Sequence, residues 1–140
     1  MYFKTIITSL MGLFLLVSCN KEDNEPQTEN LNRSELLVGK WKTTYGGPSL
    51  DSLVPVDPNY GFIDEYKKDG TGTSTYLYDS SVDPFKWVLS KDQKIMTQTR
   101  EYEGEPDVFD VEFYSFERDK FIIKDTSFGE VTYGVFERVK

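Results

Sequence analysis

The sequence predicts an all-β domain, an eight-stranded antiparallel up-and-down barrel. Three observations predict this class. The chain contains no Ala, the best helix former, and 15% of its residues are aromatic, which favours strands. Apolar and polar residues alternate through most of the chain after residue 39. Turn residues separate these alternating stretches at intervals of about 8–14 residues.

Residues 1–18 have the features of a secretory signal peptide and are set aside from the fold. One charge, Lys4, precedes an apolar run from Ile6 to Val17. A run of about a dozen residues is too short to span a bilayer comfortably, which disfavours the alternative of a transmembrane helix. Leu16-Val17-Ser18-Cys19 then resembles the lipobox of bacterial lipoproteins.

The lipobox resemblance implies that Cys19 carries a diacylglycerol and that its new amino group takes a further acyl chain such as palmitate. Two or more chains give stable membrane anchoring. The implied location is the cell envelope, in the outer membrane. The alternative is an incidental Cys in an ordinary signal peptide.

Residues 19–30 form a polar, acidic stretch without periodicity, which predicts a solvated tether. Lys21-Glu22-Asp23 also resembles the Lys-acidic-acidic export tag of surface lipoproteins in one group of Gram-negative bacteria. The tag implies exposure at the cell surface, and a generic acidic tether is the alternative.

Charge and composition exclude several classes of function. Without residues 1–18 the chain has 15 Lys and Arg against 24 Asp and Glu, a formal charge of −9, which repels nucleic acid and anionic lipid. The chain has no His, which excludes Ser-His-Asp and Cys-His catalysis and most zinc sites. A single Cys permits no internal disulfide. We therefore expect no cofactor, no metal and no enzymatic activity.

The domain spans residues 31–140. Ser34 is expected to cap a short helical turn that ends at Gly39. Eight strands follow, with Asp69-Gly70 as a hairpin signal between the second and third. Their predicted ranges are 40–45, 60–68, 71–78, 85–90, 94–102, 108–116, 121–124 and 131–139.

The connection from Gly46 to Asn59 is long, contains three prolines and has no strand pattern. It is either a lid at the barrel mouth or an exposed connection, and its apolar residues favour a loop packed on the barrel. The other connections are short, so sequential strands should pair as hairpins. Closure into a barrel removes the exposed edges and leaves room for side chains or one small ligand. A two-sheet sandwich is the alternative.

Several motifs resemble, in their order, the small lipocalin-like domains of bacterial lipoproteins. They are Leu37-Val38-Gly39-Lys40-Trp41, Tyr66-Lys67-Lys68-Asp69-Gly70-Thr71-Gly72, Phe85-Lys86-Trp87 and Phe136-Glu137-Arg138-Val139. The resemblance covers the whole domain and implies that Gly39, Trp41 and Arg138 close one barrel end. The domain is shorter than a typical lipocalin, which puts a deep ligand pocket in doubt.

Five aromatic residues are candidates for an inward face that is either plain core or the lining of a ligand cavity. They are Tyr66, Tyr76, Trp87, Phe113 and Tyr133. Acidic pairs such as Asp64 with Glu65 are expected on the solvated surface.

Two hypotheses of function follow. The first is a lipid-anchored lipoprotein that binds a small apolar or amphipathic molecule, as the family resemblance implies. The second is a protein-interaction or accessory module with a filled barrel. An enzyme that uses paired carboxylates would need two acids to converge in a cleft, which the sequence does not indicate.

Overall fold

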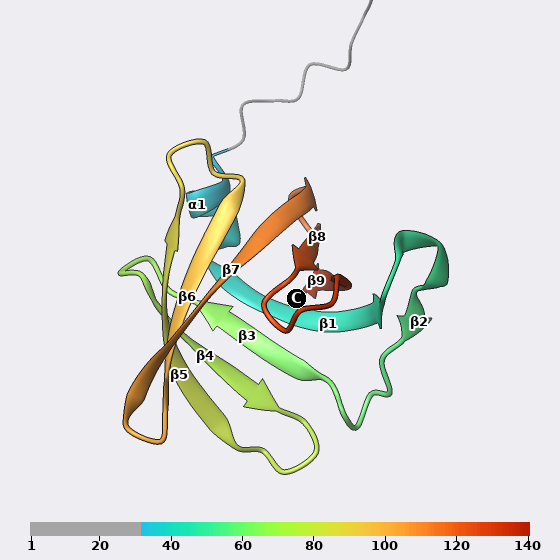
Figure 1. Ribbon diagram of the computed structural model, residues 1–140, viewed down its shortest axis with the longest axis horizontal. Coiled ribbons are helices and arrows are strands. Elements are labelled where there is room, and N and C mark those ends of the chain that lie inside the picture. The colour runs from blue at the N-terminus through green and yellow to red at the C-terminus, as the bar shows by residue number, and fades with distance from the viewer. Residues whose placement is uncertain (1–31) are drawn as a thin grey trace, which may run out of the picture.

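The computed structural model describes residues 32–140, which form a closed antiparallel barrel of eight strands with one extra strand at its rim (Figure 1). The predicted fold class is confirmed. The predicted signal peptide over 1–18, Cys19 and the tether over 19–30 lie outside the described residues. Within residues 32–140, no helix combines the length and the hydropathy needed to cross a membrane.

Each of the eight predicted strands is present. Strands β5 and β7 begin about three residues earlier than the alternation indicated, because their first three residues are exposed and show no alternation of buried and exposed positions. The barrel strands are β1 (Gly39–Gly47), β3 (Phe62–Tyr66), β4 (Thr71–Tyr76), β5 (Val82–Leu89), β6 (Ile95–Tyr102), β7 (Glu105–Phe116), β8 (Lys120–Asp125) and β9 (Thr132–Arg138).

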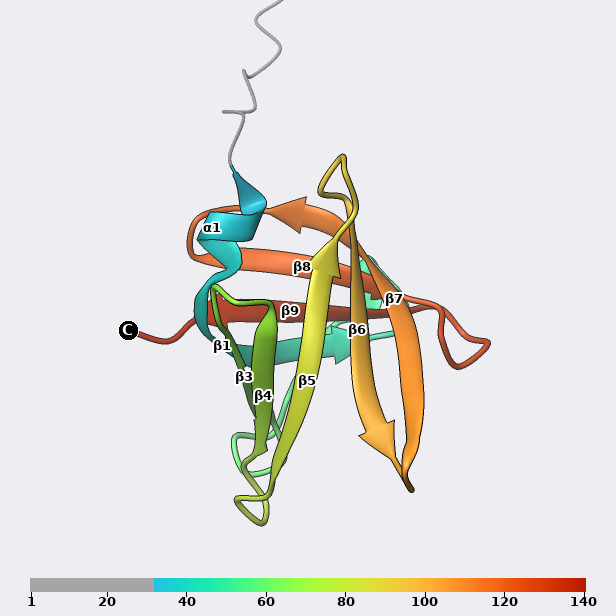
Figure 2. The ribbon, with the colours of Figure 1, turned by 90° about the vertical axis from the view of Figure 1, so that its left-hand side faces the viewer.

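The sheet is a simple meander that closes on itself. Each barrel strand pairs with the next along the chain, and β9 pairs with β1. The closing register runs from Trp41 opposite Arg138 to Gly47 opposite Tyr133, with an irregularity between Thr43 and Tyr45. A single closed sheet rules out the two-sheet sandwich. Figure 2 shows β1, β8 and β9 crossing behind the steeply inclined β3–β7.

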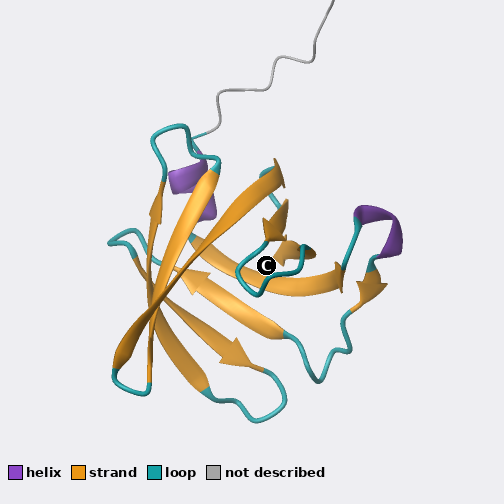
Figure 3. Ribbon diagram, in the orientation of Figure 1, coloured by secondary structure: helices purple, strands orange, loops and turns teal. Residues whose placement is uncertain are grey.

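The long connection after β1 contains structure that the sequence did not indicate. A 3₁₀ turn, η1 (Leu50–Ser52), leads into β2 (Val54–Pro55), which pairs with Tyr45 and Gly46. Figure 3 shows this segment beyond the end of β1, at the side of the barrel. The side chains of Leu50, Leu53 and Val56 are partly buried, whereas Val54 is exposed.

The helical turn before the barrel, α1 (Arg33–Leu37), begins two residues earlier than expected. Its N-cap residue is Asn32, whose carbonyl accepts the first backbone hydrogen bonds, so the expectation that Ser34 is the cap is wrong. Ser34 instead donates its hydroxyl hydrogen to the Asn32 side chain. The guanidinium of Arg33 donates to the carbonyl of Gln93 and lies over the Phe116 ring, which fixes α1 across one end of the barrel.

Aromatic rings fill the half of the barrel below α1. Trp41 packs against Phe121 at a centroid distance of 4.6 Å, and Phe121 stacks on Phe136 at 4.8 Å. Phe113 and Phe116 complete the group at 5.0 Å from each other. We call the end covered by α1 the closed end. The opposite end, where the β1–β3, β4–β5, β6–β7 and β8–β9 connections lie, is the open end (Figure 2).

Candidate functional site

The closed end is sealed by three residues that meet at the β1–β9 seam. The guanidinium of Arg138 lies over the Trp41 ring and donates hydrogen bonds to the carbonyls of Leu36 and Val38. A Cβ at Gly39, where φ is +134°, would lie 2.7 Å from Nη1 of Arg138. This position therefore requires glycine both for its backbone conformation and for the close approach of the guanidinium.

The middle of the barrel holds a buried polar cluster. Asp64 is 2% exposed, and its two carboxylate oxygens accept hydrogen bonds from the hydroxyls of Ser74 and Tyr66. Gln98 donates from Nε2 to the Tyr66 hydroxyl at 3.0 Å. The expectation that Asp64 is solvated is wrong, since its place between Phe62 and Tyr66 on β3 turns it inward, where donors from other strands meet it.

Arg100 completes the cluster from β6. Its Nη2 donates to the hydroxyl of Ser74 at 2.9 Å and to Oε1 of Gln98 at 3.3 Å, and its Nη1 donates to the hydroxyl of Tyr76 at 3.3 Å. All three acceptors are neutral. Nε of Arg100 is buried and has no hydrogen-bond partner among the described residues. A buried donor without an acceptor is costly, so Nε marks a place where an acceptor would be stabilised.

The guanidinium of Arg100 is held by aromatic rings as well as by hydrogen bonds. Its central carbon lies 5.3 Å from the centroid of Phe85 and 5.6 Å from that of Phe109. These distances are within the range of cation–π attraction. The two rings and the three acceptors together hold the guanidinium in one orientation.

Burial raises the pKa of Asp64 to about 6, although the hydrogen bond from Ser74 and the positive charge of Arg100 act in the opposite direction. Burial, followed by the neighbouring Asp64 charge, raises the pKa of Tyr66 well above its usual value. The Tyr66 hydroxyl therefore stays protonated at neutral pH and serves the cluster as a donor.

A cavity of about 120 Å³ adjoins this cluster inside the barrel. Its polar wall includes Asp64, Gln98 and Arg100, and Asp125 lies towards the open end. The rest of the wall is mostly apolar and comes from β3, β6, β7, β8 and β9. These apolar residues include Phe62, Met96, Phe109, Val111, Ile123 and Phe136. The cavity has room for about four water molecules, so its volume matches only a small molecule or one end of a larger one.

The structure brings four of the five predicted aromatic residues to the barrel interior. Tyr66 and Phe113 are buried, Trp87 packs against the Tyr66 ring at 5.7 Å, and Tyr76 hydrogen-bonds to Arg100. Tyr66 lies directly at the cavity. Phe113 and Trp87 belong to the filled closed half, where they act as core.

Tyr133 lies on the outside of the barrel, so its assignment to the inward set is wrong. It is the cross-strand partner of Lys124, whose ammonium lies 3.9 Å from the exposed Glu112 carboxylate, and partners share a face. Its ring packs against Tyr114 on the outer wall. Phe136, three residues further along β9, takes the inward position instead.

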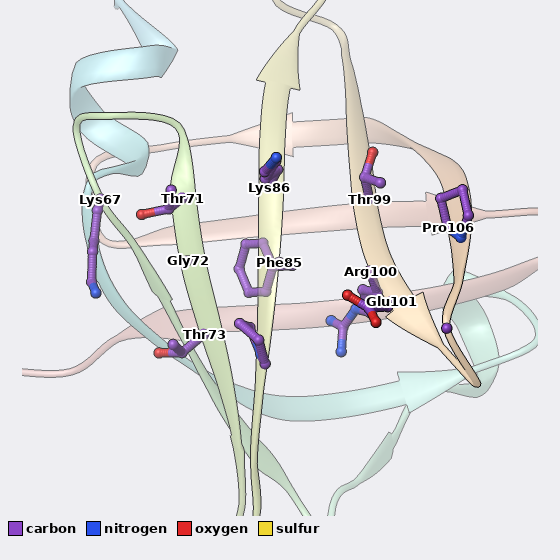
Figure 4. A pocket seen from close by; sticks show the side chains of 12 residues that line it. Lys67, Thr71, Gly72, Thr73, Phe85, Lys86, Thr99, Arg100, Glu101 and Pro106 are labelled. Carbon is purple, nitrogen blue, oxygen red and sulfur yellow. The ribbon is translucent and has the colours of Figure 1, made fainter.

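A second depression, of about 550 Å³, crosses the outer wall of β4–β7 (Figure 4). Thr71, Thr73, Lys86 and Thr99 line it, with Glu101 towards the open end, and its lining also includes Phe85 and Arg100. It is more open to solvent than the interior cavity, which favours the interior cavity as the place where a ligand would be desolvated. The interior cavity with its polar cluster is therefore the candidate site.

No family model matches the chain, and no curated protein matches its sequence. Within the described residues, no three His, Cys, Asp or Glu side chains come together as a metal site. The arrangement can hold an acceptor group against Arg100 and an apolar group against the rings of Phe62, Phe109 and Phe136.

Proposed function

We propose that the chain is a lipid-anchored lipoprotein of the bacterial cell envelope whose lipocalin-like barrel binds one small amphipathic molecule from its open end. One observation supports a ligand: Arg100, whose Nε has no hydrogen-bond partner among the described residues, lines a cavity whose remaining wall is mostly apolar. A ligand oxygen would complete the hydrogen bonds of Arg100, and its apolar part would cover the rings of Phe109 and Phe136.

The size of the cavity limits the ligand. A cavity of about 120 Å³ is smaller than the several hundred Å³ that enclose a whole drug-sized molecule. The ligand is therefore a small molecule, or a longer one that inserts only its polar end and extends through the mouth. This agrees with the short length of the domain relative to a typical lipocalin.

The membrane anchor rests on the lipobox at Leu16-Val17-Ser18-Cys19. An anchored barrel faces the outer membrane environment, and Lys21-Glu22-Asp23 favours the cell surface. Growth with a labelled fatty acid should label the wild-type chain. The Cys19→Ser variant should carry no label and should no longer be found in the membrane fraction. External protease on intact cells should degrade the domain if it is surface-exposed, and complete protection would overturn that location.

Native mass spectrometry of the full chain, purified from its own host in mild detergent, tests the ligand. A reproducible added mass that disappears on denaturation is expected. Ile123→Phe should abolish it because the ring fills the cavity, and Arg100→Met should weaken it because Nε is lost. Val88→Phe on the exposed outer wall is the control and should retain it. A bare mass, unchanged after incubation with an envelope extract, would overturn the proposal.

A second function, a protein-interaction module, is favoured by the aromatic filling of the closed half around Phe121. In that case the outer surface, and not the interior, carries the activity. Lysate proteins that bind equally well to the wild type and to Ile123→Phe would show that the cavity plays no part.

A further inference from the structure

The two ends of the barrel differ sharply in their exposed side chains. Each of the four connections at the open end carries an exposed aromatic residue at or beside its turn. The four are Tyr60 (71% exposed), Tyr78 (61%), Tyr102 (69%) and Phe128 (87%). The three turns at the closed end, over residues 67–70, 90–94 and 117–120, carry no exposed large apolar side chain.

Charge follows the same division. The open-end segments 46–61, 77–83, 101–107 and 125–131 contain ten Asp or Glu and no Lys or Arg. The three closed-end turns contain six Lys or Arg and four Asp or Glu. We call the four open-end segments the mouth surface. The helical turn α1 lies at the closed end, so the mouth surface faces away from α1 (Figure 2).

We propose that the mouth surface docks a basic segment of another protein. Exposed Tyr and Phe rings provide the anchors that dominate binding at protein interfaces. Arg and Lys side chains bind to the faces of such rings, and the surrounding carboxylates attract the same side chains. The mouth surface has no cation of its own to occupy these groups.

The sign of the charge excludes other occupants. Anionic lipid and nucleic acid are repelled by a surface with carboxylates and no basic residue. A second copy of this chain would have to present its closed end, whose mixed charge and lack of exposed aromatics make it a poor complement. A basic segment of a different protein is the occupant that fits both the rings and the acids.

This inference goes beyond the small-molecule site and does not depend on it, since Arg100 takes no part in it and Asp125 is the one acid of the mouth surface that also lines the interior cavity. The two fail separately. Ile123→Phe removes the cavity and leaves the mouth surface intact, whereas changes at Tyr102 and Phe128 alter exposed side chains that do not line the cavity.

Site-specific photo-crosslinking in the native host tests the proposal with the full chain. A photoreactive phenylalanine analogue replaces Phe128 or Tyr102 at the mouth surface. The matched control replaces Tyr114, an exposed aromatic on the outer wall of β7. Adducts at Phe128 and Tyr102 should exceed those at Tyr114 by about tenfold, the discrimination that hot-spot residues typically give. The crosslinked peptide should contain an excess of Lys and Arg.

The crosslinked segment, synthesised as a peptide, is then titrated against the full chain in lipid nanodiscs. The double variant Tyr102→Ser/Phe128→Ser should weaken binding at least about tenfold, and Tyr114→Ser should leave it unchanged. Binding should also weaken between about 50 mM and about 500 mM salt, since exposed charges are screened. An adduct on a neutral or acidic segment, on lipid or on glycan, equal crosslinking from Tyr114, or no adduct from either mouth position would overturn the proposal.

Discussion

The guanidinium carbon of Arg138 lies 4.2 Å from the centroid of the Trp41 ring, where the last strand pairs with the first. The ring nitrogen of Trp41 donates to the carbonyl of Leu37 at 2.7 Å. Nη1 of Arg138 donates to the carbonyl of Val38 at 3.1 Å. One pair of side chains thus joins α1, β1 and β9 and closes the barrel at that end.

Trp41→Ala should destabilise the domain by about 3–5 kcal/mol, because the ring is fully buried and its removal leaves a cavity against Phe121. Chemical denaturation measures the loss. Phe128→Ala, at an exposed ring, is the control and should change the free energy of unfolding by less than about 0.5 kcal/mol. A loss below about 1 kcal/mol for Trp41→Ala would reject its role as a plug.

Arg138→Met should cost about 2–3 kcal/mol, because it removes the cation over Trp41 and leaves the carbonyls of Leu36 and Val38 without their donor. Arg138→Lys should recover only part, since an ammonium cannot reproduce the planar fork. The same denaturation assay checks both variants, with Arg118→Met at an exposed turn as the control. Equal stability of the Lys and Met variants would show that the charge plays no role.

Asp64 should make stability depend on pH. Burial raises its pKa from 3.8 to about 6, so the native state binds this proton more tightly than the unfolded state does. The resulting stabilisation is fully present below about pH 3.8 and is lost as the pH rises through about 6, a loss on the order of 3 kcal/mol. Asp64→Asn should remove this dependence in urea unfolding measured at a series of pH values.

The control for the pH dependence is Asp107→Asn, at an exposed carboxyl on β7, which should keep the wild-type profile. If Asp64→Asn also keeps the wild-type profile, Asp64 does not titrate in this range in the folded protein.

Gly72→Ala should destabilise by about 2–3 kcal/mol, because a Cβ there would overlap two ring atoms of Phe85 and lie 2.6 Å from the carbonyl oxygen of Glu65. Thermal unfolding measures the effect. Gly46→Ala is the matched control, since the nearest atom to its Cβ would be 3.7 Å away. Equal melting temperatures for the two variants would contradict the close packing at Gly72.

The strands were predictable because their pattern is local: Phe109, Val111 and Phe113 alternate with polar residues, and the alternation alone places them inward. Strand β2 was not predictable, because two residues that include a proline have no periodicity. It forms where β1 extends beyond its pairing with β3, which leaves the backbone of Tyr45 and Gly46 free to pair on that side.

The candidate site was predictable only in part. The alternation put Asp64 on the same face as Phe62 and Tyr66, but the usual preference of acids for the surface argued the other way. Its burial depends on the Ser74 hydroxyl of β4, which donates to it, and on the positive charge of Arg100 on β6, and the sequence does not specify how these strands approach. Tyr133 was wrongly placed in the inward set. Arg138 on the same strand points inward over Trp41, and residues five apart on a strand point to opposite faces, so Tyr133 points outward.

The seam between β1 and β9 has a consequence for biogenesis. It joins residues as far apart as Val38 and Arg138, 100 positions along the chain. Until residues 132–138 have paired, β1 and β8 both present unpaired edges, and the Trp41 ring has no guanidinium over it. The barrel therefore cannot close until β9 has been added, whichever of the earlier strands pair first.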